Sequence, residues 1–394
     1  MTASADTPPD LVIPTLDVRS LARRALVPAG VAAFAAAALV IAGGPVHEFA
    51  KALGRALDAD PRWVGAAALF ELLSFVGYVS VLWLVGSRAT SRLGFRASAQ
   101  VTLGGAAATR LLPTGGLGGA ALTIWAFRRA GLGARGATRT LLAFLVLLYS
   151  VFLTSIAVAG GAIALGVAPA DGPLALSAAP AVAAVLAIAG GLALAAFART
   201  LPADAPSSPG RPAARGARSV VARVRAAAGD TPAALGTGIR DALALVRSAD
   251  PRLLGALAWW GFDAAVLWAM LHALGAPPSI AVVVLGYFVG QVANTIPIPG
   301  AVSGGMVGVL LAFGVEPGLA LASVLAYRSV AIWLPAPIGL AALNGLRRTT
   351  ARWAAEDAPD IEPEPAATPA ATRRDPVIAL PARPLVEPAM QAAA

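Results

Sequence analysis

Apolar residues along this chain occur in long unbroken runs and in a few short, interrupted ones. The long runs occupy residues 25–43, 63–86, 140–166, 174–198, 253–275 and 319–344. As α-helix, with a rise of ~1.5 Å per residue, each is long enough to cross a hydrocarbon core of ~30 Å. The pattern predicts an all-α, polytopic integral membrane protein with about six full spans.

The two interrupted segments read LLPTGGLGG at residues 111–119 and IPIPGAVSGG at residues 296–305. Most of the apolar arms beside these Pro/Gly breaks reach only ~16–20 Å as helix, which is too short to cross a membrane. A broken helix leaves backbone groups that only protein or water can satisfy at membrane depth, and in transporters such breaks point to a binding site. We expect two re-entrant helical hairpins, with two pairs of short, tilted spans as the alternative.

The net charge of +9 comes almost entirely from arginine, and it indicates the topology. Basic clusters flank the apolar segments at Arg88, Arg92, Arg96, Arg128, Arg129, Arg135, Arg139, Arg347 and Arg348. By the positive-inside rule these clusters are cytoplasmic, which requires each interrupted segment to make an even number of crossings. The first hairpin then enters from the cytoplasm and the second from outside, and both termini are cytoplasmic.

The remaining segments are assigned from this topology. Residues 1–24 form a cytoplasmic N-terminal segment, and residues 25–348 form the transmembrane domain, which includes a basic cytoplasmic loop at 199–252. Within that loop, residues 232–246 predict a short surface helix. Residues 349–394 are rich in proline and alanine and predict a disordered cytoplasmic tail.

The two interrupted segments also resemble each other. Residues 113–119 align with residues 299–305 without a gap, and each segment carries a GxxxG spacing, at Gly115/Gly119 and at Gly300/Gly304. Such spacing permits close contact between helices. Opposite entry sides and similar sequences together suggest inverted-topology repeats, in which span–hairpin–span recurs upside down.

Four ionisable residues are expected at membrane depth: Glu71, Asp263, Arg110 and Arg328. A charge at the bilayer centre costs ~2.5–3.5 kcal/mol on insertion scales, so these side chains should face protein or water. In the functional interpretation both arginines attract a lipid phosphate, while the acids take up protons or meet a cationic headgroup. In the structural interpretation, Asp263–Arg328 and Glu71–Arg110 are ion pairs that hold spans together.

Polar residues and helix breaks near the hairpin tips complete the candidate site. Gln291 and Asn294 are three residues apart and share a helix face, where they either bond the broken backbone or line a path. Tyr287 is interpreted as an interior or interface anchor. The candidate substrate-binding residues are Arg110, Pro113, Gly115, Gly116, Gln291, Asn294, Pro297, Pro299, Gly300 and Arg328.

Composition argues against several other functions. Charged residues make up 13% of the chain, against ~25% in soluble domains. There is no cysteine, and the two histidines lack metal-ligand spacing. A GxGxxG match at residues 131–136 has neither a preceding strand nor a following acid, and is interpreted as a turn. We therefore expect no catalytic residue, cofactor, metal or nucleic-acid partner.

Three stretches together resemble the lysylphosphatidylglycerol synthase transmembrane (flippase-like) family of bacterial membrane proteins. They are TRLLPTGGLGG at 109–119, the IPIPG break with its following glycine pair at 296–305, and YRSVAIWLPAPIGLAALNGLRR at 327–348. The chain departs from the family pattern because members commonly carry a Glu shortly after each break, whereas the stretches Gly118-Gly119-Ala120 and Gly304-Gly305-Met306 contain no acid. The segment after residue 348 is also too short for the aminoacyl-transferase domain of the synthases.

The resemblance implies a protein of the bacterial cytoplasmic membrane that moves a phospholipid or a lipid-linked anionic substrate between leaflets. Two alternatives stay open: a membrane-embedded lipid headgroup transferase or phosphatase, and a membrane anchor for a cytoplasmic lipid-modifying enzyme. The expected partner is a membrane lipid with an anionic headgroup, and a homo-oligomer is one option for the assembly.

Overall fold

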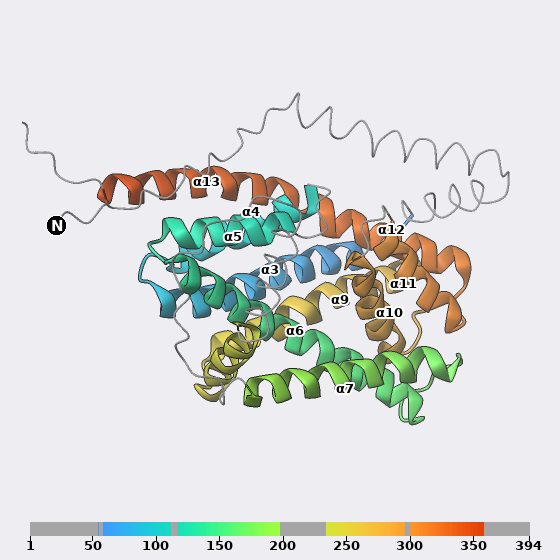
Figure 1. Cartoon of the computed structure of the whole chain (residues 1–394). Helices are drawn as coiled ribbons and strands as arrows, with labels where there is room; N and C mark the ends of the chain where they lie inside the picture. Colours follow the sequence, from blue (N-terminus) through green and yellow to red (C-terminus); the bar gives the residue numbers. More distant parts are fainter. Residues whose placement is uncertain (1–53, 55–57, 112–116, 198–233, 296–299, 358–394) are drawn as a thin grey trace, which may run out of the picture.

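The computed structural model describes residue 54 and residues 58–111, 117–197, 234–295 and 300–357 (Figure 1). These residues form helices joined by short connections, with no strand among them. Five segments within them are long and apolar enough to cross a membrane: Pro61–Ala89, Ala134–Ala164, Leu174–Phe197, Pro251–Leu274 and Pro317–Glu356. They confirm the all-α, polytopic class and coincide with five of the six predicted spans. The first predicted span, 25–43, lies outside the described residues.

Helices α3 (Pro61–Ala89) and α9 (Leu254–Leu274) begin with the same three residues, Asp-Pro-Arg. The carboxylate of Asp60 accepts a hydrogen bond from the backbone N–H of Arg62, and that of Asp250 accepts one from Arg252. In both cases the proline occupies the first helical position, where its missing N–H costs nothing. In α9 this start forms the short 3-10 turn η1 (Pro251–Leu253). This repeated start supports the inverted repeats and was missed in the sequence analysis.

Both interrupted segments form helical hairpins. In the first, α4 (Phe95–Leu111) packs against α5 (Leu117–Arg129); in the second, α10 (Ile280–Val292), extended by η2 (Ala293–Thr295), packs against α11 (Ala301–Ala312). Figure 1 shows the first pair toward the left and the second toward the right. The tips at 112–116 and 296–299 lie outside the described residues.

A glycine at the same aligned position faces the partner arm closely in each hairpin. A Cβ on Gly119 would lie 2.8 Å from the Gly105 carbonyl oxygen, and one on Gly305 would lie 3.1 Å from the Gly290 Cα. The predicted GxxxG contact is wrong at Gly304, where nothing lies within 4 Å of an added Cβ. Helix rotation in the hairpin decides which neighbouring glycine faces the partner arm.

Each hairpin also ends in the same way. Gly131 follows α5 with φ 94°, and Gly314 follows α11 with φ 79°. The next residue donates its N–H back into the helix, from Leu132 to Phe127 and from Val315 to Leu310. This is the Schellman ending, for which glycine pays no steric penalty. The predicted turn at residues 131–136 is thereby confirmed for its first residues, which lead into α6 (Ala134–Ala164).

Helix contacts follow the proposed repeats. α3 packs antiparallel along α9, crossing where Gly77 meets Gly255. Pairs in the first half have counterparts in the second: α3–α4 and α9–α10, α5–α6 and α11–α12, α3–α6 and α9–α12. Here α12 is Pro317–Trp333, and α7 (Leu174–Phe197) covers α6 outside this set. The matching pairs are those that two repeats of span–hairpin–span would make.

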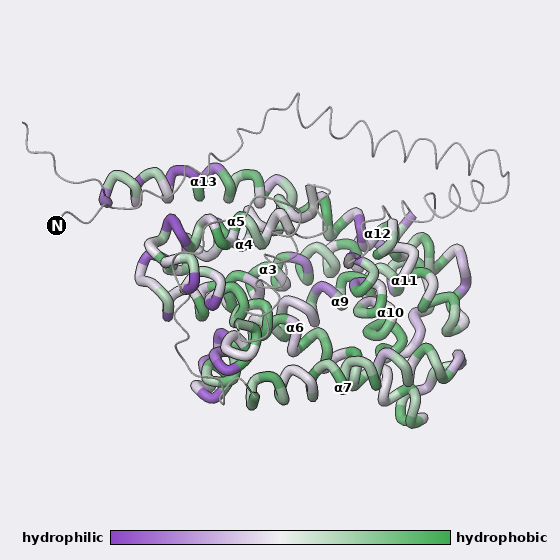
Figure 2. Tube along the Cα trace, viewed as in Figure 1, coloured by the Kyte–Doolittle hydropathy of each residue, from purple (hydrophilic) through white to green (hydrophobic). Residues whose placement is uncertain are grey.

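The predicted basic clusters gather at one end of the molecule. Arg88 pairs with Asp250 at 3.6 Å, and Arg92 pairs with Asp357 at 2.6 Å. Arg139 pairs with Asp241 on the helix at residues 234–247. Hydrophilic residues colour the same left-hand side of Figure 2. The loops that contain Gly172 and Gly275 lie together, away from these ion pairs. Gly275 is close to Leu319 and Gly172 is close to Phe313.

The helix expected on the surface at 232–246 is observed at 234–247, and it is more than a surface element. Ile239, Ala242 and Leu245 are buried, and an added Cβ on Gly238 would lie 2.8 Å from Leu142 Cβ on α6. The three-residue spacing of these apolar positions places them on one face, which docks on the bundle.

Two boundaries near the C-terminus differ from the prediction. The last span, predicted as one run at 319–344, is divided into α12 and α13 (Pro335–Glu356) at Leu334. Residues 349–356, predicted as part of a disordered tail, are helical, because α13 continues to Glu356 and buries Trp353. Thr349 donates its hydroxyl to Gln100 Oε1 of α4 at 2.8 Å, and this packing extends the helix beyond the apolar run. Residues 358–394 lie outside the described part.

Candidate functional site

Three of the four charged residues predicted at membrane depth lie well inside their helices. Glu71 is about 15 Å along α3, Asp263 about 14 Å along α9, and Arg328 about 17 Å along α12, at ~1.5 Å per residue. In a core of ~30 Å these positions are close to the midplane. Glu71 is 1% exposed and Asp263 is 2% exposed.

Asp263 is the centre of a buried hydrogen-bond network. Tyr287 on α10 donates its hydroxyl to Asp263 Oδ2 at 2.5 Å, and Tyr327 on α12 lies 3.3 Å from Oδ1. Gln291, one turn after Tyr287, donates its amide to the Tyr327 hydroxyl at 3.3 Å. The network therefore joins one full span, the first arm of the second hairpin and the following span.

Aromatic packing holds this network in place. Tyr287 and Tyr327 are 0% and 1% exposed, and their rings meet edge to face at 6.1 Å. Trp260, one turn before Asp263 on α9, contacts Tyr287 and donates its indole N–H to the Leu148 carbonyl of α6. A large ring locked by such contacts positions its hydroxyl with little freedom.

Arg328 follows Tyr327 on α12 but does not join the network. It forms no ion pair and no side-chain hydrogen bond with any residue that the structure describes. The Asp263–Arg328 ion pair weighed from the sequence is not formed, because consecutive helical residues point about 100° apart. The acid is satisfied by phenols, and the guanidinium remains available.

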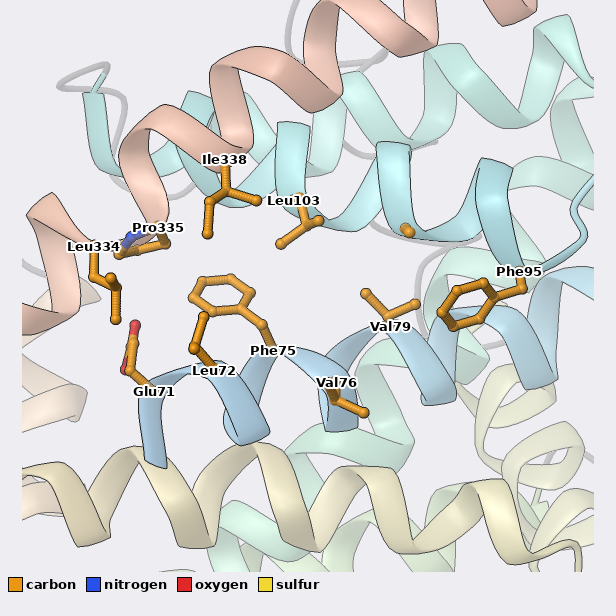
Figure 3. Close-up of a pocket in the computed structure, with 11 residues that line it drawn as sticks. Glu71, Leu72, Phe75, Val76, Val79, Phe95, Leu103, Leu334, Pro335 and Ile338 are labelled. Atoms are coloured by element: carbon orange, nitrogen blue, oxygen red, sulfur yellow. The ribbon is translucent and has the colours of Figure 1, made fainter. Parts of the chain in front are cut away.

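Glu71 occupies a different environment from Asp263. It lies at one end of an apolar cavity, beside Leu334 and Pro335 where α12 gives way to α13 (Figure 3). Sequence analysis placed the two acids in corresponding spans. Counted from the repeated Asp-Pro-Arg start, Glu71 is eleven residues after Asp60 and Asp263 thirteen after Asp250. Two residues turn a helix by about 200°, so the acids face different neighbours.

The structure describes only part of the predicted tip residues. Gly300 is the N-cap of α11 with φ 85°, and Asn294 lies exposed in η2, beyond the end of α10. Arg110 is in the last turn of α4, but its side chain is not among the described ones. The Glu71–Arg110 ion pair therefore stays a prediction. Pro113, Gly115, Gly116, Pro297 and Pro299 also lie outside the described residues.

Sequence reasoning did not select Tyr287 or Tyr327 as site residues. Tyr287 is confirmed as an interior residue, but its role as a donor to Asp263 was missed. The available signal was a buried acid in an apolar span with no cation at helical spacing, which requires neutral donors on neighbouring helices. Within the described residues, no group of three His, Cys, Asp or Glu side chains is arranged to hold a metal ion.

Comparison with known proteins identifies the family. No curated protein matches the chain. The family model described as "Lysylphosphatidylglycerol synthase TM region" matches residues 25–339, which include both hairpins, the Asp263 network and Arg328. The chain therefore belongs to the lysylphosphatidylglycerol synthase transmembrane-region family and is a multi-pass α-helical membrane protein of lipid metabolism or transport.

Proposed function

We propose that this protein moves a phospholipid, or another lipid with an anionic headgroup, between the leaflets of the bacterial cytoplasmic membrane. The observation that carries the proposal is Arg328, a cation near the membrane midplane without an anionic partner among the described residues. Such a residue costs ~2.5–3.5 kcal/mol in a lipid-facing span. A lipid phosphate passing through the protein would provide the missing charge.

The second hairpin supports this role by its geometry. Its arms, α10 and α11, are 13 and 12 residues long, so each reaches only ~18–20 Å. The N-terminus of α11 thus ends inside the membrane, where its free N–H groups carry a partial positive charge. In transporters, such half-helix ends bind anionic groups of the substrate.

The Asp263 network attaches this hairpin to the rest of the protein. Tyr287 and Gln291 lie on α10, while Asp263 and Tyr327 lie on the two spans beside it. Any movement of α10 relative to α9 changes the hydrogen bonds of a buried carboxylate. The network therefore ties the position of the hairpin to the hydrogen bonding of Asp263, and the lipid movement is passive or coupled to an ion gradient.

In this proposal the arginine-rich end faces the cytoplasm. The positive-inside rule gives this orientation, which also places the chain termini and the 199–252 loop in the cytoplasm. Anionic lipids of the inner leaflet would gather at the same end, because each Lys or Arg near the surface attracts them with about 1 kcal/mol.

The test is leaflet exchange of fluorescent phosphatidylglycerol in liposomes that contain the purified protein. Arg328→Ala should slow exchange about tenfold or more, since a hydrogen bond to a charged group is worth ~1.5–3 kcal/mol. Arg328→Lys should retain part of the rate. Arg348→Ala, which removes an exposed arginine from α13, is the matched control and should leave the rate unchanged.

Two results would contradict the proposal. Equal rates for wild type and Arg328→Ala would show that the guanidinium is not on the lipid path. If exchange and the yield of folded protein decline together in Arg328→Ala, while Arg348→Ala keeps both, Arg328 has a structural role.

A further inference from the structure

An apolar groove between α3, α4 and the α12–α13 junction has no role in the network around Asp263. Its volume is about 240 Å³, and of its lining residues only Glu71 is polar. The walls consist of Leu72, Phe75, Val76 and Val79 from α3, Phe95, Ala99 and Leu103 from α4, and Leu334, Pro335 and Ile338. The groove is open on one side, where Val76 and Phe95 are exposed.

The groove has two different ends (Figure 3). Phe95 closes one end, and its ring packs edge to face on Trp83 at 5.6 Å. The Arg252 guanidinium lies 4.7 Å from the centre of the Trp83 ring. Aromatic rings beside arginine are typical of the membrane–water interface. Glu71 closes the other end near the midplane.

The dimensions fit one hydrocarbon chain. From residue 95 to residue 103 of α4 the wall is about 12 Å long, close to the ~15 Å thickness of one leaflet's hydrocarbon. Ligand pockets for whole drug-sized molecules begin at ~300 Å³, so this space is too small for a headgroup with its tails. The Glu71 carboxylate at the midplane end of the groove is unfavourable for an acyl chain that reaches past the midplane.

Positive charge beside the Phe95 end of the groove favours a lipid with an anionic headgroup. Arg96 follows Phe95 in the first turn of α4, is exposed, and forms no ion pair with any described residue. The free N–H groups of the same first turn add a partial positive charge. Arg92 pairs with Asp357, whereas Arg96, next to Phe95 in the chain, has no acidic partner among the described residues.

We propose that the groove binds one acyl chain of an anionic glycerophospholipid from the leaflet at the arginine-rich end, with the phosphate at Arg96. This site binds a lipid in its ordinary leaflet orientation. It goes beyond lipid movement through the Asp263–Arg328 region, and it holds whether or not that movement occurs.

The experiment uses the full chain in nanodiscs of phosphatidylcholine that contain a little phosphatidylglycerol with a diazirine on one acyl chain. After irradiation, peptide mass spectrometry locates the adducts. We expect them at residues 72–79, 95–103 and 334–338, in excess over the lipid-exposed face of α7. An excess of unlabelled phosphatidylglycerol should remove them, a readout that needs no variant.

Two pairs of matched variants test the two parts of the site. Ala99→Trp should lower groove adducts about tenfold by filling the space, whereas Ala187→Trp on the exposed face of α7 should not. Arg96→Gln should lower adducts from phosphatidylglycerol about fivefold and leave those from a phosphatidylcholine probe unchanged. Arg128→Gln, an exposed arginine at the same end, is its control.

Adducts spread evenly over the groove and α7, or equal yields from the two probes in wild type, would overturn the proposal. Leaflet exchange is measured separately on the same protein. Specific groove adducts without exchange would retain this site and reject the transport function, and exchange without groove adducts would do the reverse.

Discussion

The close crossing inside the second hairpin gives the sharpest test of the fold. An added Cβ on Gly290 would lie 2.9 Å from the backbone nitrogen of Met306 and 2.2 Å from its Cγ. Met306 Cγ can move with its side chain, but the backbone nitrogen moves only with α11. Gly290→Ala therefore forces the two arms apart or strains them where they are.

The expected cost follows from overpacking of a tight contact. Such insertions destabilise by about 1–3 kcal/mol, although alanine gains ~0.5–1 kcal/mol over glycine within a helix. Gly290→Ala should thus lower stability by about 1–2 kcal/mol net. Gly308→Ala is the matched control on α11: nothing lies within 4 Å of its added Cβ, so it should be neutral or stabilising.

The assay is thermal unfolding of the purified protein in one detergent, followed by tryptophan fluorescence, with leaflet exchange as the second readout. Gly290→Ala should unfold at a lower temperature than wild type, and Gly308→Ala at the same or a higher temperature. If the two variants unfold at the same temperature, α10 and α11 do not cross at Gly290, and the second hairpin does not have this geometry.

The other predictions concern the acid network and the arginine-rich end. Tyr287→Phe removes a donor from the buried Asp263 carboxylate and should lower the free energy of unfolding by about 1–3 kcal/mol. Tyr149→Phe, at a tyrosine that is 51% exposed, should change little in the same denaturation experiment, and equal effects would refute the network. At the other site, the hydrogen bonds from Arg92 lower the pKa of Asp357 below its ordinary value. This contribution is present above the ordinary pKa of an aspartate and is lost as the pH decreases through the lowered pKa. The stability difference between wild type and Asp357→Asn should therefore be present at pH 7, smaller near pH 3 and weaker in high salt; a difference that does not change with pH would contradict the pairing.

Local sequence signals account for most of the fold. Apolar length predicted five segments that the structure shows as helices long and apolar enough to cross a membrane, and the Pro/Gly breaks predicted both hairpins. These features are local, because a bilayer requires each span to satisfy its own backbone and to be long enough by itself. The repeated Asp-Pro-Arg at residues 60 and 250 was equally visible and would have placed the two repeats in register.

Contacts between distant helices could not be predicted in the same way. The sequence indicated that Asp263 and Arg328 lie at membrane depth, and ion pairing was one reasonable option for them. The structure instead pairs Asp263 with Tyr287 and Tyr327, because helix rotation turns those hydroxyls toward it and Arg328 away. Similarly, Thr349 and Trp353 belong to a packed helix because Thr349 bonds α4 and Trp353 is buried in the core, not because of their own composition.

The sequence by itself thus determined the class of protein, the spans, the broken hairpins and the clustering of arginine, since each depends on residues close together in the chain. Tertiary structure alone decided which glycine makes each crossing, which groups satisfy the buried acid and where α13 ends. It also created the groove between α3, α4 and the α12–α13 junction. These features depend on the rotation and docking of whole helices, which packing across the bundle sets.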